Sequence, residues 1–208
     1  MSNSNHVDQP VIAGIVLAAG TSSRMGQPKQ LLDWEGRPLV RAIVETALAA
    51  RLDEVVVVIG SAGGEVATAL ANLPVRIVPN PLTAAGQSTS LRAGIAALSP
   101  DAAAVVVLLA DQPFVTTAII EALIGAWLDS GLPIVAPVFA GTRGNPVLFD
   151  RSVFAELLAI EGDQGARGVV ARDPARVRYV HFDDDRPLFD IDTPEAYAHA
   201  RALLASIE

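Results

Sequence analysis

The chain has 208 residues, 51% of them hydrophobic and 5% aromatic, which is enough for one domain with a sizeable core. Its formal net charge of −8 argues against nucleic acid or an anionic membrane as the main partner. It contains no cysteine, which excludes thiol catalysis, thiolate metal sites and disulfides and is typical of the reducing cytoplasm.

Residues 1–10 are polar, and we expect them to form a disordered lead before a single domain over residues 11–208. The lead has no apolar centre, so it does not resemble a signal peptide. No apolar stretch is long enough to cross a bilayer. These features predict a cytoplasmic protein that does not bind membranes.

Short apolar runs alternate with amphipathic stretches along the first two thirds of the chain, and the alternation loosens after that. This pattern predicts a three-layer α/β fold with a mixed, mostly parallel sheet. The last helix starts at a Thr193 cap with Pro194 in its first position. The predicted strands are residues 11–17, 55–59, 75–78, 103–109, 133–137, 146–149 and 177–182. The other predicted helices are residues 39–50, 65–71, 88–98 with Ser88 as the cap, 117–129, 152–159 and 164–171.

A loop rich in glycine and hydroxyl side chains follows the first predicted strand, residues 11–17. The end of a buried parallel strand is a common place for an α/β protein to bind phosphate groups. Gly20 and Gly26 allow backbone conformations and close approaches that a Cβ would block. Their spacing fits neither a P-loop, since five residues separate them, nor the dinucleotide pattern G-x-G-x-x-G.

Two cations, Arg24 and Lys29, also belong to this loop. The planar guanidinium of Arg24 suits phosphate oxygens, and Lys29 carries a mobile point charge. The stretch therefore predicts a nucleotide-phosphate loop whose positive charges are on side chains. The alternative is a surface loop with two ordinary cations.

Carboxylates follow or precede other predicted elements. Asp111 comes just after the apolar strand 103–109, where open α/β sheets place their ligands, and it suits Mg²⁺ shared with a triphosphate. The same residue also suits a turn cap. Asp190 and Asp192 precede the last helix, and in a strand their alternate side chains would direct both carboxylates to one cation.

Residues 17–32 read Leu-Ala-Ala-Gly-x-Ser-x-Arg-Met-Gly-x-Pro-Lys-x-Leu-Leu. This motif resembles the signature of the nucleotidyltransferases that act on the molybdenum cofactor. Ala-Ala-Gly with Pro-Lys is most similar to the cytidylyltransferase branch, whereas the guanylyltransferase relatives more usually carry Ala-Gly-Gly and Asp-Lys. The resemblance continues through Leu-Ala-Asp-Gln-Pro at 109–113 and Asp-Ile-Asp-Thr-Pro-Glu at 190–195. It implies a Rossmann-like sandwich of the glycosyltransferase-A type.

The resemblance also implies the roles of individual residues. Arg24, Lys29 and Asp111 would be catalytic, and Asp111 and Asp192, rather than Asp190, would hold Mg²⁺. The nucleotide-binding residues would be Leu17, Ala18, Ala19, Gly20, Arg24, Lys29, Gly60, Gly86, Ser88, Ser90 and Leu91. The acceptor-binding residues, from two stretches on the pterin side, would be Gly144, Asn145, Pro146 and Gly165.

The activity that the resemblance implies is transfer of CMP from CTP to molybdenum-carrying molybdopterin, with release of pyrophosphate. A molybdoenzyme or its chaperone would then receive the product. The alternatives are a guanylyl preference, another small phosphorylated acceptor, a reductase of a heterocyclic compound, and a non-catalytic chaperone for the cofactor. The set of Arg24, Lys29, Asp111 and Asp192 argues against a pure binding module, and the missing dinucleotide pattern argues against a nicotinamide enzyme.

Overall fold

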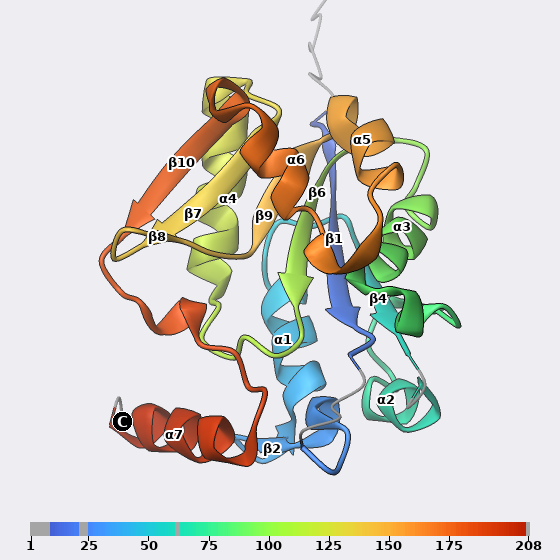
Figure 1. The fold of residues 1–208 in the computed structure, drawn as a ribbon, viewed down its shortest axis with the longest axis vertical. Coiled ribbons are helices and arrows are strands. Elements are labelled where there is room, and N and C mark those ends of the chain that lie inside the picture. Colours follow the sequence, from blue (N-terminus) through green and yellow to red (C-terminus); the bar gives the residue numbers. More distant parts are fainter. Residues whose placement is uncertain (1–8, 21–24, 61–62, 207–208) are drawn as a thin grey trace, which may run out of the picture.

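The computed structural model describes residues 9–20, 25–60 and 63–206 (Figure 1). Most of the expected disordered lead therefore lies outside the described residues. So does Arg24.

An eight-stranded sheet forms the middle of the molecule, with strand order β10-β7-β9-β6-β1-β4-β5 and β8 beside β7. β1 runs parallel to its neighbours β4 and β6. β5 pairs in parallel with β4, and β10 pairs in parallel with β7. β9 runs antiparallel between β6 and β7, which confirms the predicted mixed, mostly parallel sheet. The strands are β1 (Val11–Ala18), β4 (Glu54–Ile59), β5 (Arg76–Pro79), β6 (Ala102–Leu109), β7 (Ile134–Phe139), β8 (Thr142–Arg143), β9 (Val147–Asp150) and β10 (Val177–Phe182).

Helices cover both faces of this sheet and complete the predicted three layers. The helices packed on one face are α1 (Leu39–Leu48), α2 (Gly63–Ala69) and α4 (Thr117–Ser130). Those on the other face are α3 (Gln87–Ala96), α5 (Phe154–Leu158) and α6 (Arg167–Arg172). None of the helices in the described ranges has the length and apolarity needed to cross a membrane.

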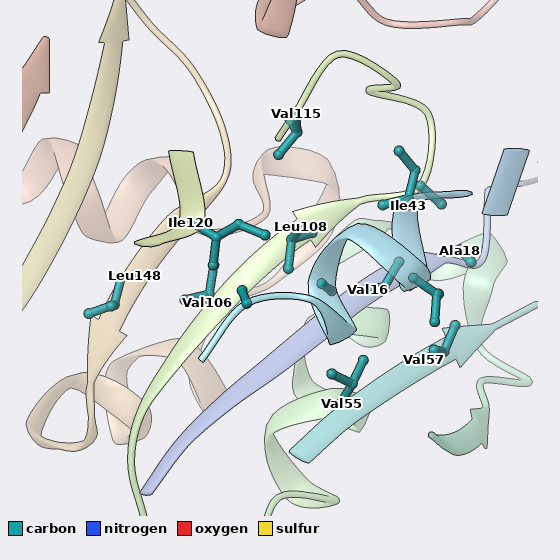
Figure 2. Packing of buried hydrophobic residues seen from close by; sticks show 14 of the residues in the cluster. Val16, Ala18, Ile43, Val55, Val57, Val106, Leu108, Val115, Ile120 and Leu148 are labelled. Carbon is teal, nitrogen blue, oxygen red and sulfur yellow. The ribbon is translucent and has the colours of Figure 1, made fainter. Parts of the chain in front are cut away.

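Strand β1 is buried on both faces because its side chains alternate between two cores. Ile12 and Val16 join the core under α1 and α4, whereas Ala13 and Ile15 join the core under α3. Figure 2 shows Val16 packed among side chains of the neighbouring strands and helices. Each large aliphatic side chain buried in this way contributes about 1.5–3 kcal/mol, so the central strand is held firmly.

A third, smaller core attaches the C-terminal helix α7 (Pro194–Ala205) to a short hairpin of β2 (Asp33–Trp34) and β3 (Arg37–Pro38). The buried members that bridge these segments include Trp34, Phe114, Ile191 and Ala200. The Tyr197 hydroxyl also donates a hydrogen bond to the Asp33 carbonyl oxygen over 2.5 Å. The segment before α7 is thereby fixed against the loop that follows β6 (Figure 1).

Some local predictions were wrong. α3 begins one residue earlier than predicted, with Gly86 at the cap position, and Ser88 lies inside the helix with its hydroxyl buried. Residues 190–192 form no strand, because no neighbouring strand pairs with them. The helices expected over 152–159 and 164–171 are shorter, and each follows a 3₁₀ turn. Thr193 does cap α7, accepting a hydrogen bond from the backbone N–H of Ala196.

Candidate active site

A cavity of about 250 Å³ opens where β1 and β6 end. These strands are parallel neighbours, so their carboxyl ends meet at one edge of the sheet, the edge where open α/β sheets bind ligands. Its lining combines the loop after β1, the start of α3 and the end of β6. The polar members include Lys29, Gln30, Ser90 and Asp111. We call it the nucleotide cavity because Gly20 and Lys29 of the predicted nucleotide-phosphate loop line it.

Lys29 is the only lysine of the sequence, and its ammonium lies between two carboxylates at this edge. Nζ is 2.6 Å from Asp111 Oδ2 and 2.6 Å from Asp192 Oδ1. Burial alone would lower the pKa of Lys29, but the charges and hydrogen bonds of Asp111 and Asp192 raise it above its ordinary value. Residues that are 82 and 163 positions apart from Lys29 thus meet at one cation.

Asp111 presents one oxygen to Lys29 and keeps the other without a hydrogen-bond partner among the described residues, although that oxygen, Oδ1, is buried. Its backbone carbonyl accepts a hydrogen bond from Ile191 N over 2.9 Å, which ties the end of β6 to the segment before α7. A buried oxygen without a partner is costly unless a ligand satisfies it. Asp111 Oδ1 is therefore open to a cation or a hydrogen-bond donor from a ligand.

Asp190 is held beside these groups by Gln112, whose Nε2 donates a hydrogen bond to Asp190 Oδ1 over 2.7 Å. Partial desolvation, together with the nearby charge of Asp111, raises the pKa of Asp190. Asp192, by contrast, points its Oδ1 at Lys29. The two carboxylates of the Asp-Ile-Asp stretch therefore have different partners, and Ile191 between them is fully buried.

Gln30 holds the start of the loop after β1 through two hydrogen bonds to backbone carbonyl oxygens. Its side chain is 2% exposed, and Nε2 donates hydrogen bonds to the carbonyl oxygens of Ala18, at 3.1 Å, and Gly20, at 2.8 Å. A single side chain thus fixes the backbone on both sides of Ala19. This holds the floor of the nucleotide cavity in place.

Asn80, a buried residue after β5, organises the loop that enters α3. Nδ2 donates hydrogen bonds to Thr89 Oγ1 and Ser90 Oγ, each over 2.9 Å, and Oδ1 accepts one from Leu82 N over 2.9 Å. Gly86, at the end of this loop, has a φ of +104°, which favours glycine. A Cβ there would lie 2.6 Å from the carbonyl carbon of Gly162, so glycine is also required for close packing.

A second cavity, of about 380 Å³, adjoins the first and shares Leu17, Gln87 and Leu109 with it. We call it the acceptor cavity because Gly144, Asn145 and Gly165, three residues expected to bind the acceptor, line it. It lies over β9 and between α3 and α6. Its polar lining includes Arg143, Asn145 and Arg167.

The structure brings most of the residues expected from the sequence to these two cavities. Ala19, Gly20, Lys29, Gly86, Ser90 and Asp111 line the nucleotide cavity. Gly144, Asn145 and Gly165 line the acceptor cavity, as does Leu91, and Leu17 lines both.

Five of the expected residues that the structure describes do not line either cavity. Asp192 contacts the Lys29 ammonium from outside the nucleotide cavity's lining. Ser88 faces the interior. Pro146 is buried, and the carbonyl oxygen of Ala18 accepts a hydrogen bond from the Gln30 side chain. Gly60 packs so closely on β1 that a Cβ would lie 2.6 Å from the Ala19 carbonyl oxygen.

Sequence reasoning missed Gln30, Asn80 and Gln87. Gln30 and Asn80 each adjoin an apolar run, and Gln87 lies between Gly86 and Ser88. These positions give no sign of which backbone or cavity the side chain will reach.

The donor set fits a divalent cation that is shared with a ligand. Among the described residues, no three His, Cys, Asp or Glu side chains cluster in a way that could hold a metal ion alone. Mg²⁺ commonly binds through one or two carboxylates and completes its shell with water and substrate phosphates. Asp111, with its unpartnered buried oxygen, and Asp192 supply such a pair.

Residues 14–177 match the description of the MobA-like NTP transferase domain, and the chain belongs to this family of nucleotidyltransferases. The family match confirms the resemblance seen in the sequence.

Three curated relatives cover nearly the whole chain. Nicotine blue oxidoreductase from Paenarthrobacter nicotinovorans is 33% identical over 201 residues, covering 90% of this chain and 95% of that protein. The purine catabolism protein PucB from Bacillus subtilis is 31% identical, covering 94% and 98%. Molybdenum cofactor cytidylyltransferase from Escherichia coli is 26% identical, covering 90% and 94%.

Solved structures are also similar over the full length. A homologue of Mycobacterium tuberculosis Rv0371c from Mycobacterium sp. strain JC1 is 31% identical, with a TM-score of 0.85, covering 95% of this chain and 98% of that one. Rv0371c itself, in a complex with manganese, is 31% identical with a TM-score of 0.77, covering 91% and 97%. The expected α/β nucleotidyltransferase fold is confirmed.

Proposed function

We propose that the protein transfers a nucleotidyl group, CMP from CTP, to the phosphate of a molybdopterin-type acceptor that carries molybdenum. The observation that carries this proposal is the Lys29 ammonium held between Asp111 and Asp192 at the end of β1 and β6, next to a second, larger cavity. Donor and acceptor would lie on either side of the shared residues Leu17, Gln87 and Leu109. Use of a nucleoside triphosphate would place the reaction in the cytoplasm.

The donor's triphosphate would lie in the nucleotide cavity. Lys29 would move its ammonium onto the triphosphate oxygens and stabilise the charge that develops on the departing pyrophosphate. Arg24, which lies outside the described residues, would add a second cation from the same loop. Asn80 and Gln30 would keep the two loops at their spacing and thereby position the nucleotide.

The reaction needs one bond to form and one to break. An oxygen of the acceptor's phosphate would attack the α-phosphorus, while the bond from that phosphorus to the oxygen bridging to the β-phosphate breaks. Pyrophosphate would leave with the bonding electrons. The acceptor oxygen is already ionised, so the chain would not need a strong general base.

Asp111 and Asp192 would hold Mg²⁺, which supplies charge neutralisation for the triphosphate when it is bound. Support for a divalent metal comes from the related Rv0371c structure, described as a complex with manganese. Support for the cytidylyl reaction comes from the 26% identity with the Escherichia coli enzyme and from the Ala-Ala-Gly and Pro-Lys motifs.

A second candidate is reduction of a heterocyclic compound. The 33% identity with nicotine blue oxidoreductase over most of both chains favours it. Under this alternative the acceptor cavity would take the heterocycle. The arrangement of Lys29 with two carboxylates, which suits a triphosphate and its metal, favours the transferase instead.

The test is pyrophosphate release from the full chain with Mg²⁺ and molybdenum-loaded molybdopterin, comparing CTP, GTP, ATP and UTP. We expect release with CTP. Release with GTP alone would move the protein to guanylyl transfer. No release with any nucleotide, together with oxidation of a reduced nicotinamide by nicotine blue, would establish the second candidate.

A further inference from the structure

The acceptor cavity has an apolar floor and a polar rim. Its floor is formed by the side chains of Leu91, Val107, Val147, Phe149 and Val170. A cavity of about 380 Å³ with such a lining takes a small organic molecule and buries most of its surface.

Two arginines line this cavity, one from each of two separate segments; Arg143 is half-buried and Arg167 is exposed. Arg143 ends β8, directly before Gly144 and Asn145, and Arg167 is the first residue of α6. They are 24 positions apart in the sequence, and the fold places them around one space.

These two arginines differ from most others in the described parts of the chain. Arg51 pairs with Glu121, Arg176 pairs with Glu156, and Arg151 donates to backbone carbonyls. The guanidinium groups of Arg143 and Arg167 make no hydrogen bond and no ion pair with any described residue.

The protein carries a net charge of −8, and carboxylates pair with many of its arginines. Two arginines without such pairs, lining one cavity with an apolar floor, suit an anionic ligand. A phosphate monoester matches this site best, because a guanidinium binds phosphate through two parallel hydrogen bonds and two guanidiniums balance its two charges.

We propose that Arg143 and Arg167 recognise the phosphate monoester of the acceptor and thereby decide which small molecules the enzyme uses. The acceptor would be an organic phosphate whose flat, apolar body packs on Val147 and Phe149. This inference rests on the proposed function for the position of the donor. It assigns a task to two side chains that the proposed function leaves without one.

The two arginines would also reduce the electrostatic repulsion between the two substrates. The attacking phosphate and the donor triphosphate both carry negative charge, and they repel each other where the cavities meet. Guanidiniums on the acceptor side offset that repulsion, as Lys29 does on the donor side. Removing them should weaken acceptor binding and leave donor binding nearly unchanged.

The test is a binding measurement without nucleotide, using pterin-6-ylmethyl phosphate and the same pterin alcohol without its phosphate. The variants are Arg143→Gln, Arg167→Gln and the double variant. The matched control is the double variant Arg92→Gln with Arg178→Gln, which changes the charge equally at exposed arginines outside both cavities. Thermal unfolding shows that each variant is folded.

We expect the wild type to bind the phosphate ester at least about tenfold more tightly than the alcohol. Each single variant should lose most of this preference, the double variant should lose all of it, and the control should keep it. An unchanged preference in the double variant would overturn the proposal, and so would equal binding of ester and alcohol by the wild type.

Turnover separates this inference from the proposed function. If the arginine variants lose the preference for the ester while no nucleotide releases pyrophosphate, the anion site stands and nucleotidyl transfer fails. If turnover occurs, the variants should raise the KM for the acceptor about tenfold and leave the KM for CTP unchanged.

Discussion

The nucleotide cavity and the acceptor cavity lie side by side and differ in whether their cationic side chains form ion pairs. In the nucleotide cavity, Lys29 is bound on both sides by Asp111 and Asp192. In the acceptor cavity, Arg143 and Arg167 have no partner among the described residues. One cavity holds its cation in an internal ion pair, and the other leaves its cations for the ligand.

The two cavities share Leu17 of β1 and Leu109 of β6 but extend from there over different elements. The nucleotide cavity stands at the ends of the parallel strands β1 and β6, which are buried on both faces. The acceptor cavity lies over β9, the antiparallel strand, whose Val147 and Phe149 form part of its floor. The nucleotide cavity is thus built at the ends of long buried strands, whereas the acceptor cavity also depends on the two-residue strand β8 and the short helix α6.

Asp111→Asn tests the donor side with the largest expected effect. The amide keeps the shape of the side chain but loses the charge that holds Lys29 and the cation. We expect the rate of pyrophosphate release to fall on the order of a thousandfold, with the thermal unfolding midpoint little changed. A rate within threefold of the wild type would remove Asp111 from the mechanism.

Lys29→Met should lower kcat on the order of a hundredfold, because the leaving pyrophosphate loses its cation. The same variant should bind Mn²⁺ more tightly than the wild type in the absence of nucleotide. The reason is that the ammonium no longer occupies the space between Asp111 and Asp192. Titration followed by the Mn²⁺ electron spin resonance signal checks this, and equal or weaker Mn²⁺ binding would contradict it.

Asn80→Ala should weaken donor binding without changing the charge of the nucleotide cavity. It removes the hydrogen bonds that Asn80 makes with Thr89 Oγ1, Ser90 Oγ and the Leu82 N–H, at a cost of about 1–3 kcal/mol in the free energy of unfolding. We also expect a higher KM for CTP and an unchanged KM for the acceptor. Denaturant unfolding and steady-state kinetics measure the two effects. A rise in the acceptor KM alone would contradict the assignment of Asn80 to the nucleotide cavity.

Asp190→Asn should have the smallest effect, a change in the free energy of unfolding whose size depends on pH. Because the pKa of Asp190 is raised in the fold, its contribution to stability is fully present below the ordinary value of 3.8 and is lost as pH rises through the raised pKa. The asparagine variant does not ionise, so it should gain stability relative to the wild type as pH rises, by less than about 1 kcal/mol. A relative stability that falls with rising pH would show that the Asp190 charge is favourable.

Much of the donor side could be predicted from the sequence, because it depends on strand ends. A buried parallel strand can be recognised by its apolar run, and the side chains that follow it must lie at one edge of the sheet. Lys29, in the loop after the first strand, and Asp111, after the strand 103–109, were each assigned to a ligand site for this reason. β10 has the predicted bounds of 177–182, and the Thr193 cap of α7 was also predicted correctly.

The acceptor side was harder to predict because its residues come from turns and short helices. Arg167 begins a helix of six residues that follows a 3₁₀ turn, and the predicted helix began at residue 164. The β2–β3 hairpin has two residues in each strand, too few for any periodic pattern. Polar residues such as Gln30 and Asn80 acquire their roles only through partners that the fold brings near.

The account is tested most directly by calorimetric titration of CTP, with Mg²⁺ present, into the wild type, Lys29→Met and the Arg143→Gln/Arg167→Gln double variant. Separate donor and acceptor cavities predict that Lys29→Met weakens CTP binding by about tenfold or more, while the double variant binds CTP as the wild type does. Equal CTP binding by wild type and Lys29→Met, or loss of CTP binding in the arginine double variant, would contradict the assignment of the two cavities.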